Sequence, residues 1–174
     1  MTRKIMSIRS CALLAVVLIF SGSLSADMVE IEASRDNTLY ENAQGSLSNG
    51  SGDYLFVGRT SSNGVRRAVI AFDDLSSIPA GSTIDSVRLH LELSREQSAS
   101  TMLGVKRLVS DWGEGTSNAS GGGGATATQG DATWIHTFFD TQNWISPGGD
   151  FMQVASAQLS VDAIGSYTIE STAT

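Results

Sequence analysis

Apolar and polar residues alternate in many short stretches of this chain. The clearest example is residues 84–93, in which Val87, Leu89, Leu91 and Leu93 take every second position and polar residues lie between them. A repeat of two places apolar side chains on one face of a β-strand, whereas an α-helix repeats every 3.6 residues. Similar stretches rich in branched and aromatic residues predict strands at residues 29–33, 37–42, 54–58, 66–73, 84–93, 103–109, 132–139, 158–163 and 167–170.

Segments of turn-forming residues separate these strands. Residues 45–53, 60–64 and 79–82 are rich in Gly, Asn, Ser and Pro, which favour turns. After the first 26 residues, no stretch of ten or more shows a helical apolar stripe. Many short strands at regular spacing predict an all-β fold, specifically an antiparallel β-sandwich or jelly roll.

One predicted loop is unusually long. Residues 113–130 are rich in glycine and nearly free of large side chains. A loop of this length inside a compact domain is usually functional or mobile. Its glycine and serine content favours mobility.

The first 26 residues have the features of a secretory signal peptide. Three basic residues precede the apolar run Ala12–Phe20, and small residues follow it up to Ala26. The run is too short to span a bilayer, which takes about 20 residues. We expect cleavage after Ala26, or alternatively after Ser25, and no membrane insertion once the signal is removed. The chain is then secreted to the extracellular space as one domain, residues 27–174.

Composition narrows the classes of partner. Cys11 is the only cysteine and lies in the leader, so a core, a metal ion or a partner must hold the mature domain. The leader also carries three of the 11 basic residues and none of the 18 acidic ones. Residues 27–174 therefore hold 8 basic and 18 acidic residues, a net charge of −10. Such a chain repels nucleic acid and anionic membranes, and neither is expected to be a partner.

The sequence contains no established catalytic motif. It lacks the nucleophile elbow, the zinc-binding His-Glu-x-x-His pattern and glycine-rich nucleotide loops. His90 lies on the polar side of its predicted strand, where a solvated histidine is the simplest interpretation. His136 shares strand parity with Trp134 and Phe138, so it is either packed or lines a groove with that tryptophan. We expect no enzymatic activity; a small lyase acting through His136 and a tyrosine is the catalytic alternative.

Acidic residues in turns suggest that the protein binds a structural calcium ion. Carboxylates and turn carbonyls are the ligands that calcium prefers. The candidate ligands are Asp36, Asn37 and Asp131. Asp also occurs in turns for backbone reasons alone, and the sequence has no spaced Asp-x-Asp-x-Asp loop. Both interpretations stay open at this point.

Aromatic and basic residues supply the candidates for ligand binding. Trp112, Trp134 and Trp144 lie in or beside the predicted loops of the second half, where aromatic faces can stack on sugar rings. Each can equally be buried in the core. Polar contacts to a ligand, for example to a uronate carboxylate, are assigned to Arg59, Arg67, Arg88 and His136. Pairing of the arginines with the excess carboxylates is the competing interpretation.

Six short motifs follow one another in a specific order. They are Asp36–Glu41 (DNTLYE), Arg66–Asp73 (RRAVIAFD), Ile78–Ile84 (IPAGSTI), Trp112–Gly115 (WGEG), Gly130–Trp134 (GDATW) and Pro147–Phe151 (PGGDF). In this order they resemble the landmarks of the DNRLRE domain family, part of which is classified as carbohydrate-binding module family 96. Tyr40 departs from the family pattern, which usually has a second basic residue at that position.

The resemblance implies a function as well as a fold. It implies a β-sandwich module of secreted or surface proteins, often beside a polysaccharide-degrading domain or enzyme, that binds an acidic polysaccharide such as alginate. Members commonly continue beyond the position of Thr174, so the resemblance also implies a chain truncated at its C-terminus with an open sheet edge. We therefore expect a secreted, non-catalytic carbohydrate-binding module. The alternative is a structural or adhesive surface domain without specific glycan binding.

Overall fold

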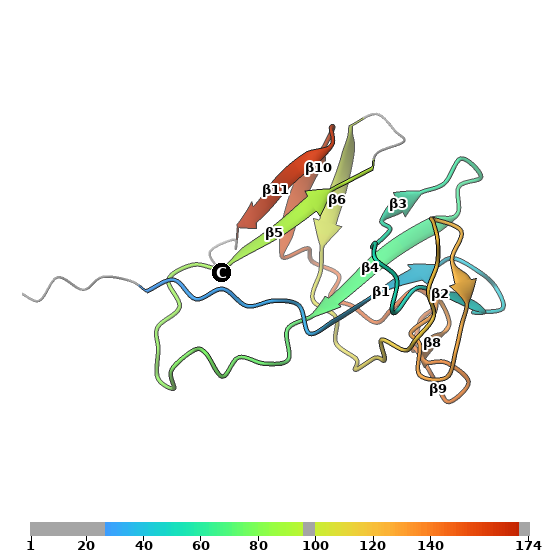
Figure 1. Cartoon of the computed structure of the whole chain (residues 1–174), viewed down its shortest axis with the longest axis horizontal. Coiled ribbons are helices and arrows are strands. Elements are labelled where there is room, and N and C mark those ends of the chain that lie inside the picture. The colour runs from blue at the N-terminus through green and yellow to red at the C-terminus, as the bar shows by residue number, and fades with distance from the viewer. Residues whose placement is uncertain (1–26, 96–99, 171–174) are drawn as a thin grey trace, which may run out of the picture.

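Antiparallel β-structure makes up the fold (Figure 1). The computed structural model describes residues 27–95 and 100–170, and within these ranges it contains strands and no helix. The all-β prediction is therefore confirmed, while the predicted signal peptide, residues 1–26, lies outside the described part. No described helix is long and apolar enough to cross a membrane. The strands are β1 (Arg35–Tyr40), β2 (Leu47–Ser48), β3 (Gly58–Arg59), β4 (Val65–Ala71), β5 (Arg88–Leu93), β6 (Thr101–Val105), β7 (Ala125–Thr126), β8 (His136–Phe138), β9 (Gln142–Asn143), β10 (Ala157–Val161) and β11 (Gly165–Glu170).

One sheet has three strands, in the order β1-β4-β3. β1 and β4 pair along their length, with Leu39 opposite Arg67 and Asn37 opposite Val69. β3 pairs only with the first two residues of β4. The last four residues of β1 are all buried, so both faces of this strand are covered. Because β1 is buried on both faces, it makes the centre of the sheet rigid. β4 is paired with this rigid strand.

The hydrophobic core lies against this sheet. Leu39, Val69, Trp112, Ala132 and Trp144 form a buried cluster. The indole of Trp144 donates a hydrogen bond from Nε1 to the carbonyl oxygen of Thr133, at 2.8 Å. The buried indole thus has its polar atom satisfied, as a tryptophan in a core requires. Partly buried hydrophobic residues around the cluster are Ala71, Leu108 and Trp134.

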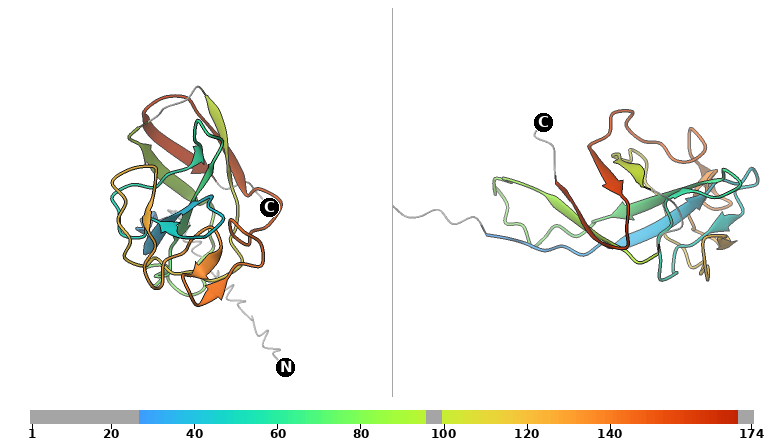
Figure 2. Two further views of the ribbon diagram at one scale, coloured as in Figure 1. Left: turned by 90° about the vertical axis from the view of Figure 1, so that its right-hand side faces the viewer. Right: turned by 90° about the horizontal axis from the view of Figure 1, so that it is seen from above.

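Two further ribbons, β5 with β11 and β6 with β10, lie together on one side of the molecule (Figures 1 and 2). Their side chains alternate: Leu89, Leu91 and Leu93 are half-buried, and the polar residues between them are exposed. Leu91 lies opposite Tyr167. The period-two pattern therefore predicted the correct faces. The described strands form one three-stranded sheet and four two-stranded sheets, so the sandwich arrangement stays a prediction.

Several predicted strands are shorter or absent. Residues 29–33 belong to no strand, and the first ladder contact of this region is the hydrogen bond from Ser34 N to Ala71 O, at 2.9 Å. Residues 54–58 contribute only Gly58 to β3, and residues 132–139 form only the short β8. β5 begins at Arg88 rather than residue 84, and β6 ends at Val105 rather than residue 109. Alternation alone does not form a strand, because each strand also needs a neighbour for its backbone groups.

The long glycine-rich loop is packed, contrary to the expectation of mobility. Residues 125–126 form β7, which pairs with β2. Asn49 is fully buried and accepts a hydrogen bond at Oδ1 from the backbone of Ala119, at 2.6 Å. Asp131, also fully buried, accepts from Thr128 N at 2.5 Å and from Ser117 N at 3.3 Å. These buried acceptors hold the loop against the β1 sheet.

Candidate functional site

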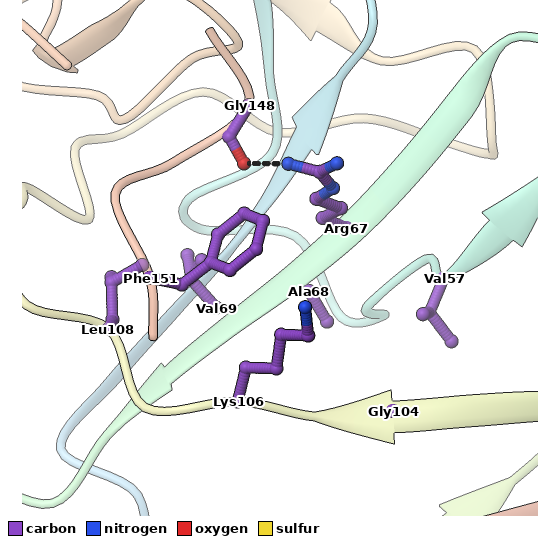
Figure 3. Close-up of a pocket in the computed structure, with 9 residues that line it drawn as sticks. All are labelled: Val57, Arg67, Ala68, Val69, Gly104, Lys106, Leu108, Gly148 and Phe151. Carbon is purple, nitrogen blue, oxygen red and sulfur yellow. Dashed lines mark hydrogen bonds between the residues drawn. The ribbon is translucent and has the colours of Figure 1, made fainter. Parts of the chain in front are cut away.

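A cleft with a volume of about 310 Å³ opens beside β4 (Figure 3). Its walls come from β4, from β6 and the residues that follow β6, and from the turn around Gly148. Ligand sites have volumes of about 300–1,000 Å³, so the cleft is at the small end of that range. We call it the cationic cleft; its lining residues are Val57, Arg67, Ala68, Val69, Gly104, Lys106, Leu108, Gly148 and Phe151.

The guanidinium of Arg67 is held by three contacts in the wall of the cationic cleft. Its guanidinium carbon lies 4.9 Å from the ring centre of Trp134 and 4.9 Å from that of Phe151. Nη1 donates a hydrogen bond to the carbonyl oxygen of Gly148, at 2.5 Å (Figure 3). Within the described residues, Nε and Nη2 form no hydrogen bond. Two aromatic rings and one carbonyl thus fix the direction of the guanidinium before any ligand arrives.

Arg67 keeps its charge in this setting. Burial lowers the pKa of Arg67; Glu41 acts to raise it and Arg59 to lower it further. An arginine nevertheless stays protonated in proteins, because its ordinary pKa exceeds about 12. Partial burial means that the charge is screened less by water than at an open surface. The guanidinium is therefore a permanent cation in a partly desolvated wall.

A second cation completes the cleft. The Lys106 ammonium lies 4.7 Å from the ring centre of Phe151. None of the lining residues is acidic. In the part of the chain that the structure describes, the ion pairs within 4.0 Å involve Arg35 and Arg88, not Arg67 or Lys106. The cleft is a local positive site in a protein whose net charge is −7.

Glycine is required at position 148. Its φ angle is +90°, in the left-handed region that side chains other than glycine avoid. A Cβ atom there would lie 2.5 Å from Arg67 Nη1 and 2.8 Å from Trp134 Cη2. The glycine lets the turn approach the arginine closely enough to accept its hydrogen bond.

A second hollow of about 260 Å³ adjoins the first, because Arg67 and Phe151 line both. Asp150 also lines it and holds the turn: its carboxylate accepts hydrogen bonds from Ile145 N and Ser146 N, each at 2.9 Å, and from Ser110 Oγ at 3.0 Å. We call it the Asp150 hollow; its lining residues are Arg67, Val109, Ile145, Ser146, Pro147, Gly149, Asp150, Phe151 and Gln153.

The prediction that tryptophans stack on a sugar is wrong for two of the three. Trp112 is 3% exposed and Trp144 is 5% exposed, and both pack in the core. A ring with no open face cannot stack on a ligand. Trp134 is half-buried, and the Arg67 guanidinium lies over its ring. Its place in the site is to position Arg67.

Of the other predicted contacts, only Arg67 lines the cationic cleft. Arg59 is exposed at the end of β3 and donates to the carbonyl oxygen of Asn63, at 3.2 Å. Arg88, on β5, forms an ion pair with Glu170 at 3.1 Å. His136 is half-buried, with Nδ1 2.9 Å from Thr133 Oγ1. Neither Arg88 nor His136 lines the cleft or the Asp150 hollow.

The predicted metal ligands do not converge. Asp36 and Asn37 are successive residues of β1, so their side chains leave opposite faces of the strand. Asn37 Oδ1 already accepts from Thr38 N at 2.6 Å and from Ser48 Oγ at 2.9 Å, and Asp131 holds the long loop. Within residues 27–95 and 100–170, no three His, Cys, Asp or Glu side chains are grouped as metal ligands. The three residues do not fit one calcium site. Bound calcium elsewhere stays a prediction, which thermal melts with excess calcium or a chelator test.

Three residues of the site were not singled out as binding residues by the sequence. Lys106 belongs to a basic set, but its direction depends on where β6 ends. Gly148 and Phe151 lie in the PGGDF motif, which combines turn residues with an aromatic ring. An aromatic residue directly after such a turn was the available signal. It did not show that the ring would lie beside Arg67, which is 84 positions earlier in the chain.

No family model matches the chain, and no significant match was found among curated proteins or solved structures. An assignment of function therefore rests on the cleft, on its charge and on the motifs of the sequence.

Proposed function

We propose that this protein is a non-catalytic binding module for an acidic polysaccharide, and that the cationic cleft holds a carboxylate of the sugar chain. The observation that carries the proposal is the pair of cations, Arg67 and Lys106, held over Phe151 in a cleft without a lining carboxylate. A secreted location and a neighbouring polysaccharide-degrading domain or enzyme belong to the same proposal. The leader-like first 26 residues and the motif resemblance support them.

The chemistry of the cleft suits a charged sugar. The remaining N–H groups of Arg67 can donate charge-assisted hydrogen bonds to a carboxylate, and such bonds contribute about 1.5–3 kcal/mol each. Val57, Val69 and Leu108 add apolar surface that suits the C–H face of a sugar ring. The aromatic rings lie under the cations, so they position charge rather than stack on sugar.

The position of the two histidines supports binding without catalysis. A lyase needs a proton-accepting group beside the sugar that its cations hold. His136 bonds to Thr133, and His90 Nδ1 lies 3.0 Å from Thr168 Oγ1 on the β5–β11 ribbon. Neither side chain lines the cleft.

Affinity electrophoresis of the full chain tests the proposal. Wild-type protein should be retarded in gels containing alginate, polygalacturonate or hyaluronan, but not in gels containing neutral dextran. Arg67→Gln should lose most of the retardation, about tenfold in affinity, because a charge-assisted bond is lost. Arg88→Gln is the matched control: it removes the same charge outside the cleft and should leave retardation unchanged. Equal behaviour of the two variants would contradict the proposed site.

A second function, self-association as a structural or adhesive domain, is favoured by one observation. The apolar faces of the β5–β11 and β6–β10 ribbons are only half-buried, and Met102 is 62% exposed. Exposed apolar surface next to strand edges is typical of interaction surfaces. Sedimentation velocity over a range of protein concentrations, without polysaccharide, tests this function: a single monomeric species would rule it out.

A further inference from the structure

The cationic cleft and the Asp150 hollow adjoin each other at a shared wall, and we call the two together the groove and each of them a compartment. Arg67 and Phe151 line both, and the adjacent residues Gly148 and Gly149 each line one of them. A sugar residue held in one compartment therefore has its neighbour in the chain at or near the other.

The two compartments differ in charge. The cationic cleft holds Arg67 and Lys106 and no carboxylate. The Asp150 hollow has the carboxylate of Asp150 in its wall. Arg67 also lines this hollow, so one cation faces the one carboxylate there. Ser146 and Gln153 are its neutral polar lining, and the exposed side chain of Ile145 adds apolar surface.

The charge of Asp150 is fixed. Three donors, Ile145 N, Ser146 N and Ser110 Oγ, bond to its oxygens. Burial acts to raise the pKa of Asp150, but these hydrogen bonds outweigh it and hold the pKa below its ordinary value. The side chain cannot turn away to make room for an anion without releasing the turn that it holds. It is a permanent negative charge beside the second compartment.

We propose that the groove selects polysaccharides in which an acidic sugar alternates with a neutral one, over uronans that carry a carboxylate on every residue. The inference rests on the proposed function. A carboxylate in the cationic cleft is attracted by Arg67 and Lys106. That carboxylate occupies Arg67, so a second carboxylate on the next residue meets the uncompensated charge of Asp150 and is repelled, since like charges at close range cost free energy. A neutral sugar in that position meets the hydrogen-bonding groups of Ser146 and Gln153 without the repulsion.

Titration calorimetry of the full chain with three polymers, at about 0.15 M salt, tests the inference. Hyaluronan alternates glucuronate with a neutral amino sugar, whereas polygalacturonate and alginate carry a carboxylate on every residue. Hyaluronan should bind about tenfold more tightly per binding site than either uronan. Equal or tighter binding of a uronan would overturn the selectivity and leave the proposed function standing. Absence of binding to all three would overturn both.

Two variants separate the effect of the charge of Asp150 from its role in holding the turn. Asp150→Asn should improve uronan binding and so reduce the preference for hyaluronan over the uronans. Asp85→Asn is its control, because it removes the same charge at an exposed position that lines neither compartment. Asp150→Asn also changes the hydrogen bonds that hold the turn, so a second variant acts on charge alone. Gln153→Glu adds a carboxylate at an exposed lining position and should widen the preference for hyaluronan over the uronans. A preference that stays constant in Gln153→Glu would contradict the inference, whether or not Asp150→Asn folds.

Discussion

Arg67 shows how neighbouring residues can prepare a single side chain for binding. Trp134 and Phe151 lie against its guanidinium, and Gly148 accepts one of its hydrogen bonds. A preformed cation loses less conformational entropy on binding than a mobile one. The same arrangement makes Arg67 sensitive to changes in residues that never touch the ligand.

Gly148→Ala tests this dependence at the residue scale. The added Cβ would lie 2.5 Å from Arg67 Nη1, and the φ of +90° is unfavourable for alanine. We expect a loss of stability of about 1–3 kcal/mol, as for other overpacked sites, and loss of polysaccharide retardation. Gly123→Ala is the control, because its Cβ meets no atom within 4 Å and it lines neither the cleft nor the Asp150 hollow. Urea unfolding and affinity electrophoresis measure the two effects; wild-type binding by Gly148→Ala would contradict the positioning of Arg67.

Asp36 gives a pH-dependent prediction at the same scale. Burial, and then the neighbouring Glu114, raise the pKa of Asp36. Because its folded pKa lies above the unfolded value of about 3.9, the stability that Asp36 contributes is present below that value and is lost as the pH rises through the folded pKa. Asp36→Asn should therefore raise the unfolding free energy at pH 7, with little change at pH 3.

Chemical denaturation at the two pH values checks the effect. Asp53→Asn, at an exposed turn position, removes the same charge and should change neither value. If Asp36→Asn destabilises the protein at pH 7, the ionised carboxylate has a favourable partner, and a bound cation becomes the first explanation to examine.

At the scale of elements, the glycine-rich loop corrects a common inference from composition. Glycine was taken as a sign of mobility, but several glycines here allow close packing. A Cβ on Gly115 would lie 1.7 Å from Asp131 Oδ1, and Gly115 has a φ of +72°. The loop is held by buried polar side chains, which short-range sequence patterns do not reveal.

Gly115→Ala should destabilise the fold by about 1–3 kcal/mol or more, since the clash involves a buried carboxylate rather than a flexible chain end. Gly121→Ala, in the same loop, meets nothing within 4 Å and should be close to neutral. Thermal melts and limited proteolysis of the loop compare the two variants. Equal, small effects would show that the loop is mobile after all.

The alternating pattern predicted a strand correctly only where a neighbouring strand is present. Residues 66–73 and 84–93 contain β4 and β5, and the alternating residues of β5 lie on the predicted faces. Residues 29–33 have the same alternation but no neighbouring strand, so they form none. Periodicity reports which faces a strand would have; it does not report whether a partner strand is present.

At the scale of the whole molecule, the site joins segments that are distant in the sequence. Arg67, Lys106 and Phe151 come from three separate parts of the chain and meet only in the fold. Composition predicted an acidic protein, and the structure places a cationic cleft within it. Arg67 was predicted as a contact because of its residue type. Its partners and the burial of Trp112 and Trp144 follow from tertiary packing, which the sequence pattern does not specify.

A charge placed in the cleft tests the central claim most directly. Gly104 lines the cleft on β6, and a Cβ atom there meets no atom within 4 Å. Gly104→Glu adds a carboxylate facing the two cations, and Gly104→Gln adds the same volume without charge. Titration calorimetry of the full chain with alginate and hyaluronan oligosaccharides compares them. We predict that Gly104→Glu weakens binding of every acidic sugar that the wild type binds by about tenfold relative to Gly104→Gln. Equal affinities in the two variants would contradict a charge-based site in this cleft.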